Sequence, residues 1–233
     1  MPTSFQIAID GPVAAGKGTV SRLVAEKLGF LYVDTGAMYR VGAWLSQKNH
    51  VDVDDGKAVA AILEKTKLEM RNPTEKEKDG RLTTVLVDGE DVSWKIRTEK
   101  VGAGSSKVAA HPEVRHILVK KQQDIAGEQN VVMEGRDITT RVLPDAQLKI
   151  YLTASDVVRA KRRHFELLTR GQDVSFEEVY NDLVERDKRD MTRAVDPLIQ
   201  APDAWVIDTS DLTIDQVVAL IVAKVEVMRS LKR

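Results

Sequence analysis

The chain has 233 residues, of which 42% are hydrophobic, and its 35 basic and 36 acidic residues leave a formal net charge of −1. A chain of this length can bury about 70–75% of the surface that it exposes when unfolded, which is enough for one large domain. The balanced charge gives no general attraction to nucleic acid or anionic membranes, and the absence of cysteine excludes disulfides and thiolate metal sites.

The N-terminal residues lack the basic stretch and apolar run of a secretion signal. The longest apolar run, from Val217 to Ala223, is about a third of a membrane span. We therefore expect a soluble, cytoplasmic protein that binds neither nucleic acid nor a membrane.

Five short apolar segments predict β-strands, and helical patterns separate them. These segments are Phe5–Ile9, Phe30–Val33, Val131–Met133, Leu148–Leu152 and Trp205–Ile207. Alternating strands and helices are typical of a parallel sheet that helices cover on both faces. We therefore predict an α/β fold of three layers.

A glycine-rich loop follows the first predicted strand. Gly11-Pro-Val-Ala-Ala-Gly-Lys17 fits the first seven positions of the phosphate-loop pattern. In such a loop, backbone amides surround phosphate oxygens, the helix N-terminus adds its positive end and the lysine supplies a cation. Ser or Thr usually comes next, but here Gly18 intervenes, so Thr19 is the candidate contact to phosphate or to magnesium-bound water. The alternative is a turn that binds nothing.

The second predicted strand leads into Asp34-Thr35-Gly36-Ala37-Met38-Tyr39-Arg40. Ligands of an open parallel sheet gather at the carboxyl ends of its strands. Asp34 and Thr35 should therefore face the site, with Arg40 on the following helix. Val132-Met-Glu134-Gly135-Arg136-Asp137 ends a later strand in the same way.

Residues 68–98 interrupt the alternation. A polar, turn-rich stretch is followed by alternating strands around Asp88-Gly89, which is a strong hairpin signal. We predict a small antiparallel insert on the α/β core.

Basic residues gather in the last third of the chain. Arg159, Lys161, Arg162 and Arg163 precede a polar turn that contains Gly171, as in an arginine-bearing lid. A capping box at Ser175–Glu178 then begins a helix, and a second one, Thr213–Gln216, begins the last helix. On the first of these helices Arg186, Asp190 and Arg193 share one face. Solvated helices with surface ion pairs are the alternative.

Phosphoryl transfer explains why many arginines would be needed. The reaction spreads negative charge over oxygens, and a phosphate acceptor brings more, which planar arginine forks neutralise better than lysine. A guanine switch needs an Asn/Thr-Lys-x-Asp element, and Thr66-Lys67 lacks the aspartate at the required place. A small-molecule kinase is therefore the leading interpretation.

Four blocks together resemble the bacterial cytidylate kinase family, from about residue 5 to residue 227: the Gly-Lys-Gly-Thr ending of Gly11–Thr19, Asp34–Arg40, Glu134–Asp137 and Arg186–Ala194. The resemblance implies phosphorylation of CMP and dCMP by ATP with Mg²⁺, by a monomer with a P-loop fold. It implies one domain, 1–233, with a core at 1–35, 100–155 and 194–233. A region at 36–99 would bind the nucleoside monophosphate (NMP), with the β insert at about 68–98, and 156–193 would form a short helical lid.

The resemblance also assigns residues. The ATP-binding set is Gly11, Pro12, Val13, Ala14, Ala15, Gly16, Lys17, Gly18 and Thr19. Ser106, Arg115 and Asp137 would recognise cytosine, because a carboxylate or hydroxyl accepts from its amino group and arginine donates to its ring acceptors. The other CMP contacts would be Asp34, Thr35, Tyr39, Arg40, Arg136, Arg186, Asp190 and Arg193. Catalysis would fall to Lys17, Arg159, Arg162 and Arg193, with Thr19 at the metal.

Two departures from the family's pattern are modest: Thr35 stands in place of serine, and Glu134 stands where aspartate is common. A broader pyrimidine monophosphate kinase or another small-molecule kinase is the alternative within the enzyme class. A nucleotide-dependent binding or switch protein is the alternative outside it.

Overall fold

The computed structural model describes residues 4–77 and 79–231. Its main sheet has five parallel strands in the order β2-β6-β1-β7-β8. All five predicted strands are present within one residue of their expected bounds: β1 Gln6–Asp10, β2 Leu31–Asp34, β6 Val131–Glu134, β7 Leu148–Thr153 and β8 Trp205–Asp208.

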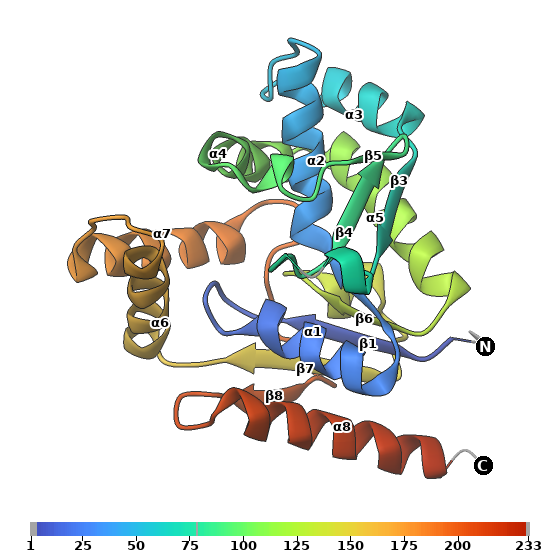
Figure 1. Ribbon diagram of the computed structural model, residues 1–233, viewed down its shortest axis with the longest axis vertical. Coiled ribbons are helices and arrows are strands. Elements are labelled where there is room, and N and C mark those ends of the chain that lie inside the picture. The colour runs from blue at the N-terminus through green and yellow to red at the C-terminus, as the bar shows by residue number, and fades with distance from the viewer. Residues whose placement is uncertain (1–3, 78, 232–233) are drawn as a thin grey trace.

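Helices cover both faces of this sheet, which confirms the predicted three-layer α/β fold (Figure 1). On β1, Ile7 and Ile9 belong to the core under α1 and α8, whereas Ala8 belongs to the core on the opposite face. On that opposite face α2 and α5 lie nearer the strands, and α4 and α3 pack against them. The bounds are α1 Lys17–Leu28, α2 Thr35–Lys48, α3 Gly56–Lys65, α4 Glu99–Val108, α5 Pro112–Glu128 and α8 Ile214–Ser230.

The insert is a small antiparallel sheet, as predicted. Its order is β3-β4-β5, with β3 Leu68–Arg71, β4 Thr84–Val87 and β5 Glu90–Asp91. Asp88 and Gly89 both have positive φ angles, 50° and 84°, which suits the tight turn between twisted strands. Two short 3₁₀ helices, η1 Glu75–Glu77 and η2 Lys95–Arg97, flank the hairpin.

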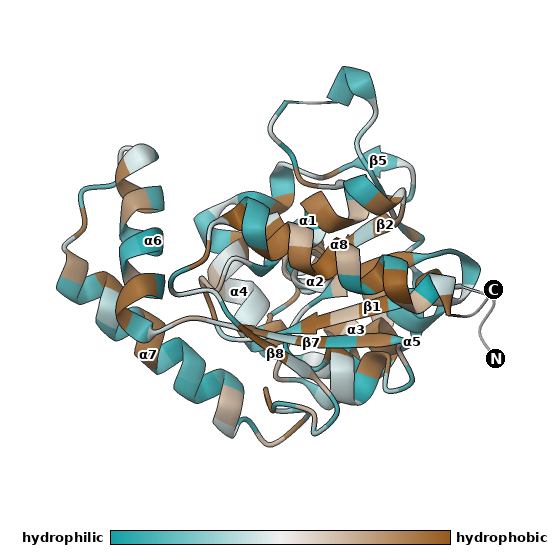
Figure 2. Ribbon diagram, turned by 90° about the horizontal axis from the view of Figure 1, so that it is seen from below, coloured by the Kyte–Doolittle hydropathy of each residue, from teal (hydrophilic) through white to brown (hydrophobic). Residues whose placement is uncertain are grey.

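The basic segment forms two helices, α6 Asp156–Thr169 and α7 Phe176–Thr192. They extend to one side of the sheet, and hydrophilic residues follow much of their length (Figure 2). Both predicted capping boxes are present, at Ser175–Glu178 and Thr213–Gln216. Within the described residues, no helix is both long and apolar enough to cross a membrane.

The glycine loop between β1 and α1 needs glycine at two positions for different reasons. A Cβ atom on Gly11 would lie 2.0 Å from the carbonyl oxygen of Leu152 on β7, and the Gly11 φ angle is 150°. Gly16 also has a positive φ angle, 88°, but a Cβ atom there would meet nothing within 4 Å. Gly11 therefore serves close packing, and Gly16 serves only the backbone conformation.

Gly11→Ala should lower the free energy of unfolding by about 3 kcal/mol or more, because backbone strain adds to a clash with backbone. Gly16→Ala should lower it by about 1–2 kcal/mol, the cost of a left-handed residue alone. Urea denaturation followed by circular dichroism measures both. Equal losses would contradict this account of the loop.

Candidate functional site

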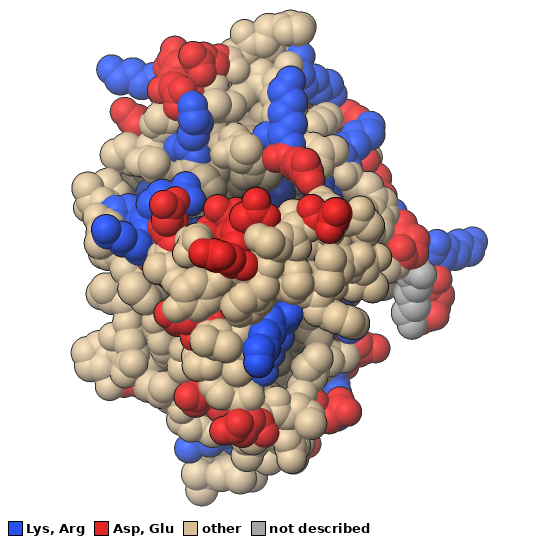
Figure 3. All heavy atoms as spheres, turned by 90° about the vertical axis from the view of Figure 1, so that its left-hand side faces the viewer, with Lys and Arg blue, Asp and Glu red and all other residues tan. Residues whose placement is uncertain are grey.

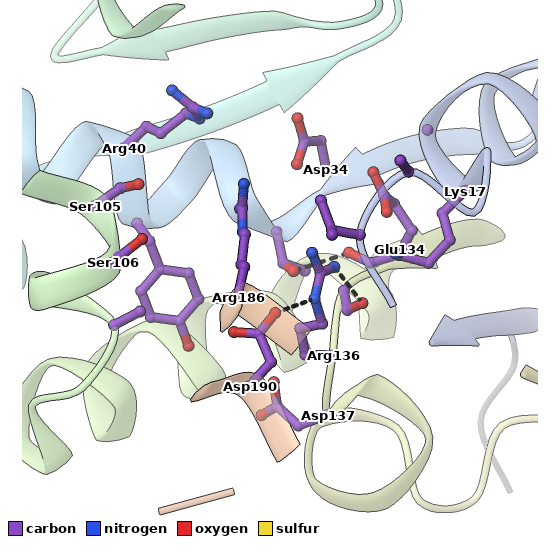
Figure 4. Close-up of a pocket in the computed structure, with 18 of the residues that line it drawn as sticks. Lys17, Asp34, Arg40, Ser105, Ser106, Glu134, Arg136, Asp137, Arg186 and Asp190 are labelled. Atoms are coloured by element: carbon purple, nitrogen blue, oxygen red, sulfur yellow. Dashed lines mark hydrogen bonds and ion pairs between the residues drawn. The ribbon is translucent and has the colours of Figure 1, made fainter. Parts of the chain in front are cut away.

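The carboxyl ends of β1, β2 and β6 open into a cavity of about 690 Å³. Ser105 and Ser106 lie at one end of it and Lys17 at the other, with Arg136 and Arg186 between them (Figure 4). The structure brings most of the predicted site residues to its wall: Val13, Ala14, Gly16, Lys17, Gly18, Thr19, Asp34, Thr35, Tyr39, Arg40, Ser106, Arg115, Arg136, Asp137, Arg186, Asp190 and Arg193.

The glycine loop forms the end of the cavity around Lys17. The Lys17 ammonium donates to the carbonyl oxygens of Gly11 and Pro12, both at 2.7 Å. Burial lowers the pKa of Lys17 to about 7, and the nearby Arg136 guanidinium contributes to the decrease. An anion bound in this loop would favour the charged form of Lys17 and so raise its pKa again. Of the predicted ATP-binding residues, Gly11, Pro12 and Ala15 lie outside the cavity wall.

Buried Asp10 fixes the loop that follows β6. Its carboxylate accepts from the backbone amide of Ile138 at 2.9 Å, and from the amide and hydroxyl of Thr139 at 2.7 and 2.6 Å. Burial raises the pKa of Asp10, and these hydrogen bonds oppose the rise. The end of β1 thereby holds the backbone next to Arg136 and Asp137 in place.

Arg115 and Asp137 form a buried ion pair at the end of the cavity near Ser106. Arg115 is 2% exposed, and its Nε atom also donates to Asp196 at 2.7 Å. Arg193 lies 3.3 Å from the other Asp137 oxygen. Burial raises the pKa of Asp137, and the two arginines oppose that rise. The polar groups of this pair are therefore held by several hydrogen bonds within the protein, as selective hydrogen bonding requires.

The middle of the cavity carries an excess of arginine. Arg136 donates to Asp190 at 2.7 Å, but Arg40 and Arg186 have no carboxylate partner among the described ion pairs. Burial lowers the pKa of both, and neighbouring arginines lower it further. On the outer face that carries α6 and α7, basic and acidic side chains are interspersed (Figure 3). The unbalanced positive charge thus lies inside the cavity, where an anionic ligand would neutralise it.

Oxygen donors lie beside the glycine loop. Tyr32 donates its hydroxyl to Glu134 at 3.2 Å, and Thr35 donates to the Glu134 carbonyl oxygen at 2.8 Å. Burial and the nearby Asp34 raise the pKa of Glu134. Among the described residues, no group of three or more His, Cys, Asp or Glu side chains is arranged to hold a metal. A cation at this place would need oxygen atoms from a bound molecule or from water in addition to those of the protein.

Two predicted lid arginines lie outside the cavity wall. Arg159 is 4% exposed and pairs with Asp187 on α7 at 2.5 Å. The backbone of Val13 lies between the two, because its amide donates to Asp187 and its carbonyl accepts from Arg159, both at 2.9 Å. Arg162 donates instead to the hydroxyl and carbonyl oxygens of Thr209. Their catalytic role stays a prediction.

Several wall residues were not assigned to the site from the sequence. Arg163 and Arg189 lie within the basic segments, so the basic composition of those segments could have indicated them. Arg97 lies at the end of the insert and Tyr32 within a strand, where neither sequence pattern suggested a ligand contact. Asp196, which accepts a hydrogen bond from Arg115, comes after the block Arg186–Ala194, and no sequence pattern indicated that contact.

Known proteins resemble the chain over nearly its whole length. The model of a family described as cytidylate kinase matches residues 7–227. The cytidylate kinase of Shouchella clausii is 47% identical over 95% of this chain and 96% of its own length, and that of Bacillus subtilis is 44% identical over 97% and 98%. Among solved structures, shikimate kinase from Acinetobacter baumannii aligns with a TM-score of 0.45 at 18% identity, covering 99% of this chain and 96% of that one.

Asp187→Ala should lower the free energy of unfolding by about 1–3 kcal/mol, because buried Arg159 keeps only its pair with the exposed Asp156 and the Val13 amide loses its acceptor. Glu166→Ala is the matched control, since it breaks exposed pairs with Arg163 and Arg170 and should cost less than about 1 kcal/mol. Chemical denaturation of both variants measures the difference. A small, equal effect would show that Arg159 and Asp187 do not bind the lid to the loop.

Proposed function

The chain belongs to the cytidylate kinase family, and we propose that it transfers a phosphoryl group from ATP to CMP and dCMP. The observation that carries the proposal is the layout of one cavity. The glycine loop with Lys17 lies at one end and Ser106 at the other, with Arg136 and Arg186 between them, and the buried Arg115–Asp137 pair also lines the cavity. Two nucleotides entering from opposite ends would meet with their phosphates among those arginines.

We assign the cytosine ring to the end with Ser106, Arg115 and Asp137. A carboxylate or hydroxyl oxygen accepts from the exocyclic amino group of cytosine, whereas uracil would present a carbonyl oxygen there. Arg115 donates to Asp137 and Asp196, so the acceptor group on Asp137 is held in a fixed direction. A site that hydrogen-bonds one substrate group can reject analogues by about 10⁴–10⁵.

The acceptor phosphate would lie among Arg40, Arg136 and Arg193, and the sugar hydroxyls would meet Asp190 and Arg186. The pairing of Arg136 with Asp190 supports a shared site for phosphate and sugar, because one side chain orients the other. The remaining residues proposed for the CMP site, which all line the cavity, are Asp34, Thr35 and Tyr39.

The donor triphosphate would occupy the loop from Gly11 to Thr19. Lys17 would leave the carbonyl oxygens that it contacts here and bind phosphate oxygens, which would restore its usual basicity. Catalysis would consist mainly of alignment and charge neutralisation by Lys17, Arg193 and the lid arginines Arg159 and Arg162. Arg163 joins this set, because it is the lid arginine of that cluster on the cavity wall.

Mg²⁺ fits the oxygen donors present. The hydroxyl of Thr19 and the carboxylate of Glu134 are hard ligands on the wall of the cavity, and Mg²⁺ commonly combines few protein oxygens with phosphates and water. When bound, the ion neutralises charge on the phosphates. We propose that Thr19 holds it, directly or through water.

The chain would then work in three parts, as a monomer. The proposed NMP-binding region begins after Thr35 and includes the insert, and α4, which carries Ser106, packs against α2 in that region. The lid consists of α6, α7 and the turn between them.

The purified protein should phosphorylate CMP and dCMP in preference to UMP, AMP and GMP by at least about 10² in kcat/KM. A coupled assay of ADP release with each acceptor measures this, with ATP and Mg²⁺ in excess. Preference for a purine acceptor, or nucleotide binding without acceptor-dependent turnover, would contradict the proposal.

Asp137→Asn should shift the preference from CMP towards UMP, because the amide can donate to the uracil carbonyl while a carboxylate cannot. We expect the CMP-to-UMP ratio of kcat/KM to fall by about 10²-fold or more. The KM for ATP, bound at the opposite end of the cavity, should stay within about twofold. A proportional loss with both acceptors would remove Asp137 from base recognition.

A further inference from the structure

We propose that Arg97 binds the phosphate group of the acceptor nucleotide and that Asp34 positions it for this contact. The inference rests on the proposed function, because it concerns how the same cavity holds its acceptor. It adds a charged residue of the insert to the acceptor residues proposed above.

Arg97 reaches the cavity from the last residue of η2. Its Nη2 atom donates to the Oδ2 atom of Asp34 at 2.8 Å, across 63 residues of sequence. The Arg97 side chain is 33% exposed, whereas Asp34 is nearly buried at 12%. No other partner of this guanidinium is seen among the described hydrogen bonds, so donors remain for a ligand in the cavity.

Both carboxylate oxygens of Asp34 accept hydrogen bonds from the protein. Its Oδ1 atom accepts from the backbone amide of Ala37 at 3.1 Å and so caps α2, while Oδ2 accepts from Arg97. A carboxylate in this position would also repel a phosphate directly. We therefore assign Asp34 an indirect part in acceptor binding: it fixes the start of α2 and the direction of the Arg97 fork.

Arg40 lies beside this pair. It donates to the carbonyl oxygen of Ile96, the residue before Arg97, at 3.4 Å. Burial lowers the pKa of Arg40, and Arg97 is the next largest cause of the decrease. Two guanidiniums thus face one carboxylate, which leaves a net positive charge at this part of the cavity. A phosphate, with several acceptor oxygens, can bind both forks at once, as a neutral hydroxyl cannot.

The position of Arg97 gives this contact a structural consequence. Arg97 belongs to the insert region, while Arg40 and Asp34 belong to α2 and the end of β2. A phosphate that binds Arg97 and Arg40 together would join the insert to the core through the ligand. A nucleoside has no phosphate, so its binding would not connect Arg97 to Arg40.

The test compares CMP with cytidine, which keeps the base and sugar but lacks the phosphate. In the full-length protein, Arg97→Gln should raise the Kd for CMP about 10–100-fold, the effect of losing a charged hydrogen bond, and leave the Kd for cytidine within twofold. Isothermal titration calorimetry measures both. The matched control is Lys95→Gln, which removes the same charge from the same turn but does not line the cavity, and it should change neither Kd.

A second variant separates binding from folding. Arg97→Lys keeps the charge but loses the planar fork, so it should weaken CMP binding less than Arg97→Gln does and again spare cytidine. Equal weakening of CMP and cytidine would mean that Arg97 only holds the insert in place, and an unchanged Kd for CMP would exclude the contact; either result overturns the inference. The proposed function fails separately, if the wild-type protein does not phosphorylate CMP.

Discussion

Charged side chains that leave water must find partners, and this requirement organises the cavity. Asp10 is satisfied by the loop after β6, and Arg115 is satisfied by Asp137 and Asp196. Each pairing joins a strand end or helix to a segment far away in sequence. The buried charges therefore hold the walls of the site together. Arg40 and Arg186, which have no carboxylate partner among the described ion pairs, line the cavity where a ligand would bind.

The same requirement connects helices α6 and α7 to the glycine loop. The backbone of Val13 lies between Asp187 on α7 and Arg159 on α6, so both helices bind the loop through one residue. Movement of these helices would therefore change hydrogen bonds of the loop. We expect motion of the proposed lid to be coupled to the loop that we propose for the donor phosphates.

Local pattern explains what could be predicted from the sequence. The strands, the hairpin at Asp88-Gly89 and both capping boxes depend on residues close in sequence, and all were correct. Most of the predicted site residues also line the cavity, because several of them belong to sequence motifs that directly follow strands β1, β2 and β6. The partners of these residues could not be predicted: Arg97 meets Asp34 across 63 residues and Arg115 meets Asp196 across 81, and only the fold brings them together.

Gly18 shows how the fold changes the meaning of a sequence feature. In the chain it interrupts the phosphate-loop pattern, since a hydroxyl residue usually follows the lysine. In the structure a Cβ atom at Gly18 would lie 3.4 Å from both the Tyr32 hydroxyl and the Glu134 carboxylate. Oxygen atoms from β2 and β6 therefore lie where a side chain at this position would extend. Gly18 and Glu134 are therefore neighbours in the site, although they are 116 residues apart in sequence.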